Sequence, residues 1–223
     1  MKLPIESRRV AGDALAEALT AYRGRKDVIV LALPRGGVPV AYQIARALDV
    51  ALDLMLVRKL GTPGQRELAM GALASGGALV LNQDIVASLG ISEAVIEQAV
   101  AEEQPELDRR EQVYRGERPR PDIAGQIIIL VDDGLATGAT MRAAVAALRS
   151  QQPARIVVAV PVAPAQTIAV LRREVDEVIC PETPEPFMAI GQWYRDFTQV
   201  SDSEVKTLLD SAWQVQDRRA RGT

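Results

Sequence analysis

Short apolar segments that alternate with helical segments are the feature that most constrains the fold of this chain. The apolar segments cover residues 28–33, 50–57, 126–131, 155–160 and 175–179. Continuous apolar runs of this length are typical of strands that are buried on both faces, as in the middle of a parallel sheet. Helical patterns lie between them at 38–48, 140–149 and 165–173. The alternation predicts an α/β fold, doubly wound around a mainly parallel sheet.

The composition excludes several kinds of site. The 223 residues include no histidine and one cysteine, Cys180. A Ser-His-Asp triad, a histidine-ligated zinc site and an intramolecular disulfide are therefore excluded. With 26 basic and 29 acidic residues the net charge is -3, so bulk charge does not favour nucleic acid as a partner. No signal region or span of about 18 apolar residues is found, and we expect a cytoplasmic protein without membrane contact.

We expect a single domain over residues 1–223, with three parts. An N-terminal helix within 1–26 begins at Ser7, and an α/β core covers 27–180. Residues 181–223 form a small C-terminal hood that is rich in proline and aromatic residues and ends in a helix. The pattern Ser201-Asp-Ser-Glu204 is a capping box, which places the start of that helix.

The part of the core between 60 and 114 is more polar than the rest. Glycine and proline punctuate residues 60–67, which predicts a mobile loop. Residues 68–73 and 78–82 resemble a short hairpin that turns near Gly76. A charged helical pattern covers 92–114, and we interpret its acidic and basic residues as a solvated face. Whether segment 68–122 closes over a site stays open.

The segment Leu130-Val-Asp-Asp-Gly-Leu-Ala-Thr-Gly-Ala-Thr140 carries unusual chemistry at a strand end. It supplies two carboxylates, two glycines and two threonine hydroxyls, which are Asp132, Asp133, Gly134, Gly138, Thr137 and Thr140. Backbone N–H groups at the start of a helix can hold a phosphate, and paired carboxylates suit a sugar diol or a hydrated cation. A plain turn with a helix cap would use the same residue types. No lysine follows the second glycine, so the segment is not a Walker loop.

This segment closely resembles the phosphoribosyl pyrophosphate (PRPP) signature of the type I phosphoribosyltransferases. Two further segments agree with that family in the required order. Leu33-Pro34-Arg35-Gly36-Gly37 is similar to the family's pyrophosphate loop. Arg58-Lys59, followed by Gly61, Pro63, Gly64 and Glu67, is similar to its basic strand end and flexible catalytic loop. The resemblance covers residues 27–179, and the tail resembles the family's variable hood.

The resemblance implies a role for each matching position. Asp132 and Asp133 bind the ribose hydroxyls, and hold Mg²⁺ either directly or only through PRPP and water. The residues that wrap the 5-phosphate are Ala136, Thr137, Gly138, Ala139 and Thr140. The residues that hold the pyrophosphate are Arg35, Gly36, Gly37, Arg58 and Lys59, of which Arg58 and Lys59 are the catalytic candidates. A cis peptide between Arg35 and Gly36 and a homodimer are also implied.

The function implied is Mg²⁺-dependent transfer of phosphoribose from PRPP to a small nitrogenous acceptor, with release of pyrophosphate. Ala136 stands where 6-oxopurine enzymes of the family carry an aspartate, so such bases are disfavoured. Phe187, Trp193 and Tyr194 are candidates for stacking on the acceptor, or else they anchor the hood. Two alternatives remain: a PRPP-sensing module without turnover, and an unrelated nucleotide-binding α/β domain.

Overall fold

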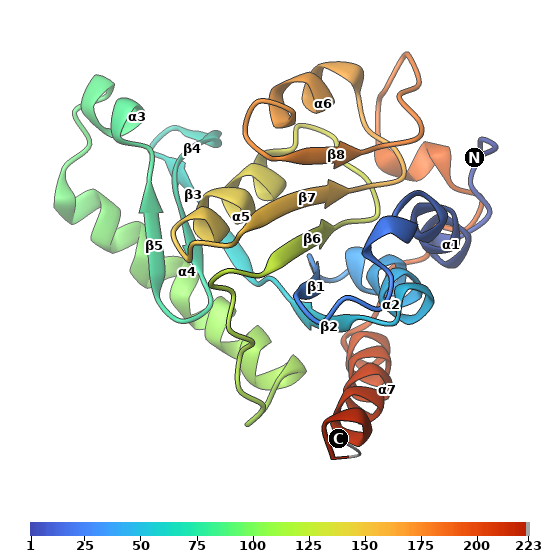
Figure 1. Ribbon diagram of the computed structural model, residues 1–223. Coiled ribbons are helices and arrows are strands. Elements are labelled where there is room, and N and C mark those ends of the chain that lie inside the picture. Colours follow the sequence, from blue (N-terminus) through green and yellow to red (C-terminus); the bar gives the residue numbers. More distant parts are fainter. Residues whose placement is uncertain (222–223) are drawn as a thin grey trace.

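A five-stranded parallel sheet forms the centre of the molecule (Figure 1). The computed structural model describes residues 1–221, without the side chains of Arg66, Glu67 and Ala220. The strand order is β2-β1-β6-β7-β8. The strands are β1 (Val28–Ala32), β2 (Ala51–Leu54), β6 (Ile127–Val131), β7 (Arg155–Ala159) and β8 (Glu177–Ile179). The predicted doubly wound, mainly parallel α/β fold is confirmed.

The order of the strands reverses between β1 and β6. From β1 the chain moves outward to β2, and after β6 it moves the other way, to β7 and β8. All five residues of β1 and all five of β6 are buried, because helices cover both faces of the sheet. Ala32 pairs with Val131 in register, so the loops that follow β1 and β6 leave the same edge side by side. Ligands of open parallel sheets bind at such a switch point.

The helices divide between the two faces of the sheet. One face is covered by α1 (Arg8–Ala18), α2 (Gly37–Leu48) and α7 (Asp202–Arg221), which share a core with Val28, Val30 and Ala32 of β1. The other face is covered by α5 (Ala139–Arg149) and α6 (Ala165–Leu171), which share a core with Ile29 and Leu31. Successive β1 side chains therefore enter different cores, which explains why the whole strand is apolar.

A second, three-stranded antiparallel sheet follows β2. It consists of β3 (Val57–Thr62), β4 (Gln65–Ala74) and β5 (Ala78–Leu81) in that order. The predicted hairpin near Gly76 is confirmed as the β4–β5 pair. The predicted loop over residues 60–67 is wrong as secondary structure, because these residues form the ends of β3 and β4 around a turn at Pro63 and Gly64, and the mobility of the segment stays a prediction. The Thr62 hydroxyl donates to the Gln65 carbonyl at 3.0 Å across that turn. The side chain of Glu67 lies outside the described part of the chain.

A long helix, α4 (Glu93–Tyr114), crosses the antiparallel sheet and reaches α7. It follows the short helix α3 (Gln83–Ser88), which the sequence patterns did not predict. Ile96, Leu107 and Tyr114 of α4 are buried, and Figure 1 shows the helix lying along the sheet and then past its edge. We refer to β3, β4, β5 and α4 together as the flap unit.

The C-terminal part begins with loops and the short 3₁₀ helix η2 (Ile190–Trp193), and a similar turn, η1 (Thr20–Tyr22), follows α1. The predicted capping box is present at the start of α7, where the backbone N–H of Glu204 donates to Ser201 Oγ at 3.1 Å. The helix is longer than the predicted 201–215 and continues to Arg221. Within residues 1–221, no helix is both long enough and apolar enough to cross a membrane.

Candidate active site

The loop between β1 and α2 lies directly against the loop that follows β6. A Cβ atom placed on Gly36 would overlap Asp133 Oδ2, and one on Gly37 would lie 2.7 Å from the Val131 carbonyl oxygen. Both glycines are therefore required by close approach, since φ at Gly36 is an ordinary -61°. The cis peptide lies between Pro34 and Arg35, so its predicted place between Arg35 and Gly36 is wrong by one residue.

The same loop supplies donors for an anion. Gly36 is the N-cap of α2, and the first N–H groups of a helix have no partner within the helix itself. Together with the dipole of this 12-residue helix, they favour a negatively charged group in front of Gly36 and Gly37. The Arg35 side chain, about one third exposed, adds a positive charge beside them.

The two aspartates after β6 differ in their surroundings. Asp133 is 7% exposed, and its Oδ2 accepts a hydrogen bond of 2.7 Å from Arg8 Nε. Asp132 is half-buried, and its Oδ1 accepts the Asp133 backbone N–H at 2.8 Å. Burial, followed by the charge of Asp133, raises the pKa of Asp132 well above its usual value. Burial also raises the pKa of Asp133, although Arg8 opposes this.

Arg8 is a residue of this site that the sequence did not reveal. It belongs to the first turn of α1, and its Nη1 donates to the Thr198 carbonyl at 2.8 Å. Its guanidinium also lies 4.1 Å from the centre of the Phe197 ring, as a cation–π contact. Arg8 therefore ties the N-terminal helix and the hood to Asp133. Its distance of 125 positions from Asp133 along the chain leaves no local signal that could have predicted the pair.

The phosphate-loop candidates wrap the N-terminus of α5. Gly138 is the N-cap with a φ of 72°, and a Cβ there would lie 2.7 Å from Thr167 Cγ2. The Ala136 carbonyl accepts the Thr167 hydroxyl at 2.7 Å, which fixes the loop from outside. Thr137 and Thr140 are exposed. All of the predicted residues, Ala136, Thr137, Gly138, Ala139 and Thr140, thus lie in one turn beside Asp132 and Asp133.

Arg58 and Lys59 do not face the same way. Neighbouring residues of a strand point to opposite faces of the sheet. Arg58 points toward α4, where its Nε donates to Glu103 Oε2 at 2.6 Å. Lys59 shares its face with Val57, which is partly buried and packs against the core formed with α5. The structure therefore separates the two predicted catalytic residues, and only Lys59 lies on the face toward the helix that begins at the phosphate loop.

The aromatic residues of the hood divide into two groups. Tyr194 is 6% exposed, its ring packs against Phe197 with centroids 5.0 Å apart, and its hydroxyl donates to the Asp133 carbonyl at 2.7 Å. This residue anchors the hood, and burial raises the pKa of its hydroxyl. Phe187 and Trp193 are half-buried, with ring centroids 6.1 Å apart. Of the three stacking candidates, these two retain partly open rings.

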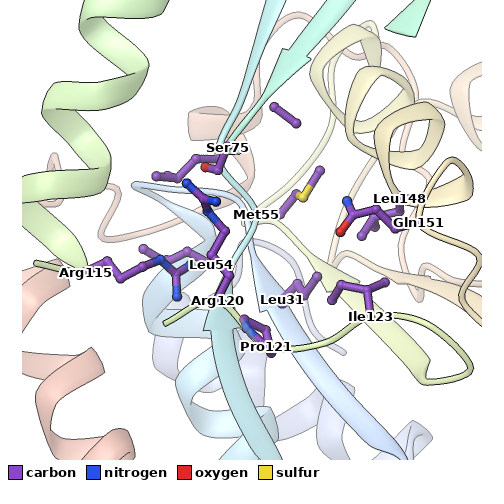
Figure 2. A pocket seen from close by; sticks show the side chains of 12 residues that line it. Leu31, Leu54, Met55, Ser75, Arg115, Arg120, Pro121, Ile123, Leu148 and Gln151 are labelled. Atoms are coloured by element: carbon purple, nitrogen blue, oxygen red, sulfur yellow. The ribbon is translucent and has the colours of Figure 1, made fainter. Parts of the chain in front are cut away.

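A small pocket lies apart from these loops, between the flap unit and the sheet (Figure 2). None of the predicted site residues lines it. Within it, Arg115 is almost fully buried and lies 2.7 Å from Asp53 Oδ1. Nε and Nη1 of Arg115 and Oγ of Ser75 make no hydrogen bond within the described part of the chain. Because these atoms are themselves enclosed, the pocket offers a place for ordered water more than for a ligand.

The comparisons with known proteins agree with this geometry. Residues 5–194 match the family model described as "Phosphoribosyl transferase domain". The chain is also 45% identical over 212 residues to a Mycobacterium tuberculosis (strain H37Rv) protein named "Putative phosphoribosyl transferase Rv0571c". That match covers 95% of this chain and 47% of the relative, so the chain spans about half the length of the curated relatives it matches.

A solved structure resembles the whole fold. The crystal structure of TT1426 from Thermus thermophilus has a TM-score of 0.85 and 41% sequence identity to this chain. The likeness covers 92% of this chain and 97% of that one. The fold and the paired strand-end loops thus define an α/β domain of the phosphoribosyltransferase type. The chain belongs to the phosphoribosyl transferase domain family.

Proposed function

We propose that this chain transfers the phosphoribosyl group of PRPP to a nitrogenous acceptor and releases pyrophosphate. The observation that supports this most is the contact between the two strand-end loops at the switch point of the sheet. Gly36, the N-cap of α2, leaves no room for a side chain against the carboxylate of Asp133. A donor-rich loop for a diphosphate therefore lies next to carboxylates suited to a ribose diol, as one molecule of PRPP requires.

The residues suit the charge changes of this reaction. The anomeric C–O bond breaks, its electron pair leaves with the diphosphate, and a nitrogen of the acceptor bonds to the ribose carbon. Positive charge grows on the ribose and negative charge on the diphosphate. Arg35, Lys59 and the N–H groups at Gly36 and Gly37 are donors that stabilise the leaving group. The phosphate loop at 136–140 holds the 5-phosphate and fixes the ribose between the two ends.

We assign the two aspartates different tasks. Asp132 accepts the ribose hydroxyls, because its side chain is more exposed than the buried side chain of Asp133. Asp133 is a positioning residue, since Arg8 already occupies its Oδ2. This assignment revises the equal roles that the family resemblance implies.

Magnesium fits this site as a partner of the substrate. In the part of the chain that the structure describes, no three histidine, cysteine or carboxylate residues are grouped to hold a metal ion. Mg²⁺ is commonly held by one or two carboxylates together with substrate phosphates. Asp132 would contact it, directly or through water, alongside the diphosphate of PRPP. When bound, the ion neutralises charge on the leaving diphosphate.

For the acceptor, we propose an aromatic nitrogen heterocycle other than a 6-oxopurine. Phe187 and Trp193 offer half-buried rings that can stack on such a base. Ala136 lacks the carboxylate that the family's 6-oxopurine enzymes carry at this position. Stacking and the absence of that charge together favour a neutral, planar acceptor.

A PRPP sensor that turns nothing over is the second candidate. It would use the same loops, and the exposed ion pairs of the flap unit would pass the signal to a partner. The other alternative, an unrelated nucleotide-binding domain, is wrong, because the chain belongs to the phosphoribosyl transferase domain family.

The deciding experiment measures pyrophosphate release from PRPP with a panel of purines, pyrimidines and other nitrogen heterocycles. A transferase releases pyrophosphate only with its acceptor, and Asp132→Asn abolishes the release. Selective PRPP binding without release across the whole panel would instead support the sensor. Failure to bind PRPP would overturn both.

A further inference from the structure

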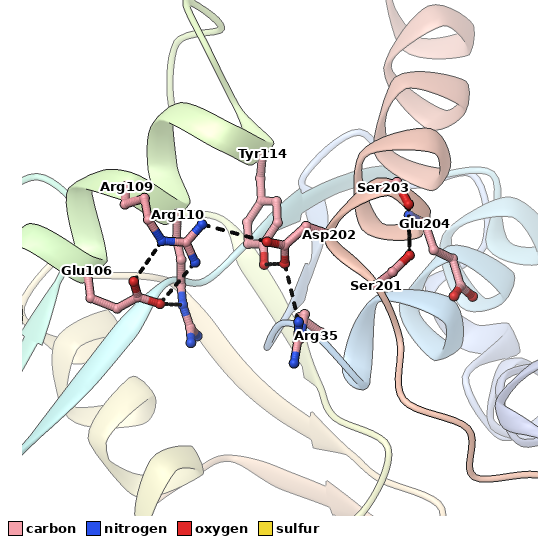
Figure 3. A network of polar contacts seen from close by, with 9 residues as sticks. All are labelled: Arg35, Glu106, Arg109, Arg110, Tyr114, Ser201, Asp202, Ser203 and Glu204. Carbon is pink, nitrogen blue, oxygen red and sulfur yellow. Dashed lines mark hydrogen bonds and ion pairs between the residues drawn. The ribbon is translucent and has the colours of Figure 1, made fainter.

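Helix α4 carries an arginine to the loop that we assign to the diphosphate. Asp202, the first residue of α7, lies between two guanidinium groups (Figure 3). Arg35 Nη1 is 3.5 Å from Asp202 Oδ1, and Arg109 Nη1 is 3.6 Å from Asp202 Oδ2. Asp202 thus lies between Arg109 of the flap unit and Arg35 of the loop, and brings the two arginines to the same part of the molecule. The charged face that the sequence predicted as merely solvated therefore reaches the site.

The carboxylate of Asp202 is held firmly. The Tyr114 hydroxyl donates to its Oδ1 at 2.6 Å, and its position in the first turn of a 20-residue helix favours negative charge. The Tyr114 hydrogen bond, followed by Arg35 and Arg109, lowers the pKa of Asp202. Asp202 is therefore ionised near neutral pH and always available to the two arginines.

The two arginines, in contrast, are held loosely at the ends that face Asp202. Nε and Nη2 of Arg109 donate to Glu106 at 2.7 and 3.1 Å, which orients the guanidinium and leaves Nη1 toward Asp202. The Arg109 side chain is 49% exposed and that of Arg35 is 36% exposed. Ion pairs of this length and exposure contribute little to stability, so a more highly charged anion can replace the carboxylate. A diphosphate is such an anion.

We propose that Arg109 binds the diphosphate group together with Arg35, and that Asp202 is the internal carboxylate with which the diphosphate competes. This inference rests on the proposed function and adds a binding residue outside the three loops already described. Asp202 then sets the affinity: it holds the arginines in place but must be displaced when the diphosphate binds. Arg109 and Asp202 thus act on affinity in opposite directions.

Arg109 and Asp202 are expected to change the affinity for the diphosphate in opposite directions, which makes the proposal testable. Inorganic pyrophosphate with Mg²⁺, and PRPP with Mg²⁺, are titrated calorimetrically into the wild-type chain and into Arg109→Ala, Arg109→Lys and Asp202→Asn. Arg110→Ala is the matched control, because Arg110 is the next residue of α4 and its Nε donates to Glu106, without a described contact to Asp202. Thermal unfolding of each variant reports whether the fold is retained.

We expect Arg109→Ala to bind pyrophosphate about 10-fold more weakly, since one charge-assisted contact is lost. Arg109→Lys should retain part of the affinity, because the positive charge remains. Asp202→Asn should bind about 3-fold more tightly, because the competing charge is removed while the Asn oxygen still accepts from Tyr114. Arg110→Ala should match the wild type within about 2-fold.

Three results would overturn the proposal. If wild type binds pyrophosphate and Arg109→Ala binds it equally well, the inference fails and the proposed function stands. If Arg109→Ala and Asp202→Asn both weaken binding, the network is structural and no competition exists. If the wild type binds neither pyrophosphate nor PRPP, the proposed function fails, and the inference fails with it.

Discussion

The two sheets of the molecule carry their charged residues in opposite ways. At the edge of the parallel sheet, Asp133 and Arg8 are nearly buried and their contact is 2.7 Å long. In the flap unit, Arg58 and Glu103 are each 30% exposed, and Arg109 is half exposed. A buried pair cannot exchange partners without a large cost, whereas exposed pairs exchange at little cost. The first region is therefore suited to fixed recognition, and the second to contacts that change when a ligand binds.

The largest effect expected is from breaking the buried pair. Arg8→Leu should lower the free energy of unfolding by about 3 kcal/mol, because the Asp133 carboxylate stays buried without its cation. Burial already raises the pKa of Asp133, and loss of Arg8 raises it further. The folded form then binds a proton more readily than the unfolded form, so stability is lost as pH rises. Urea unfolding should show a larger loss at pH 8 than at pH 5.

Arg9→Leu is the control for this variant, since Arg9 is exposed and the change in net charge is the same. It should leave the unfolding curve unchanged. Equal unfolding curves for Arg8→Leu and the wild type would contradict the idea that the buried ion pair contributes more to stability than the exposed pairs.

The next effect concerns the two basic residues of β3. Lys59→Ala should lower kcat about 100-fold and weaken PRPP binding less, because charge on the leaving diphosphate grows in the transition state. Arg58→Ala should lower kcat less than about 5-fold, since Arg58 faces Glu103 on the other side of the sheet. Steady-state kinetics with the acceptor measure both. Equal losses of kcat in the two variants would mean that the face of β3 on which each side chain lies does not determine its role in catalysis.

A third test compares two glycines. Gly36→Ala should lower stability by about 2 kcal/mol, because its Cβ would overlap Asp133 Oδ2. Gly64→Ala meets no atom within 4 Å, but its φ of 78° costs about 1 kcal/mol. Only Gly36→Ala should also lose PRPP affinity. If calorimetry finds equal PRPP affinities for the two variants, the close packing of the two loops is not needed for PRPP binding.

The smallest effect is a gain in stability. The pKa of Asp132 is raised in the folded chain, so its contribution to stability is complete below about pH 4 and is lost as pH rises through the raised value. Asp132→Asn should therefore increase the free energy of unfolding at pH 8 by about 1 kcal/mol, although PRPP binding is lost. The difference should disappear near pH 4. A destabilised variant at pH 8 would show that Asp132 supports the fold and is not held there for binding.

The apolar runs predicted the parallel sheet because a strand that is buried on both faces has apolar side chains at every position, and this pattern is visible in its own residues. The strand-end loops were predicted from their own glycine, threonine and aspartate residues, although the residues that crowd Gly36 and Gly138, namely Asp133 and Thr167, are distant in the sequence. The flap unit was harder to predict, because the alanines and the single glycine of β4 have no strand preference of their own and form a strand only through pairing with β3 and β5. Arg8 and Arg109 could not be found, since their partners are distant in the sequence.

The contact between Arg8 and the Thr198 carbonyl has a consequence for biosynthesis. The two residues are 190 positions apart, and Tyr194, which holds the Asp133 carbonyl, comes late as well. Asp133 is translated long before the hood. Arg8 can contact both Asp133 and the Thr198 carbonyl only after Thr198 has been translated. Long-range contacts of this kind form late in folding. The nascent chain thus gains its finished aspartate pair only after Thr198 has been translated.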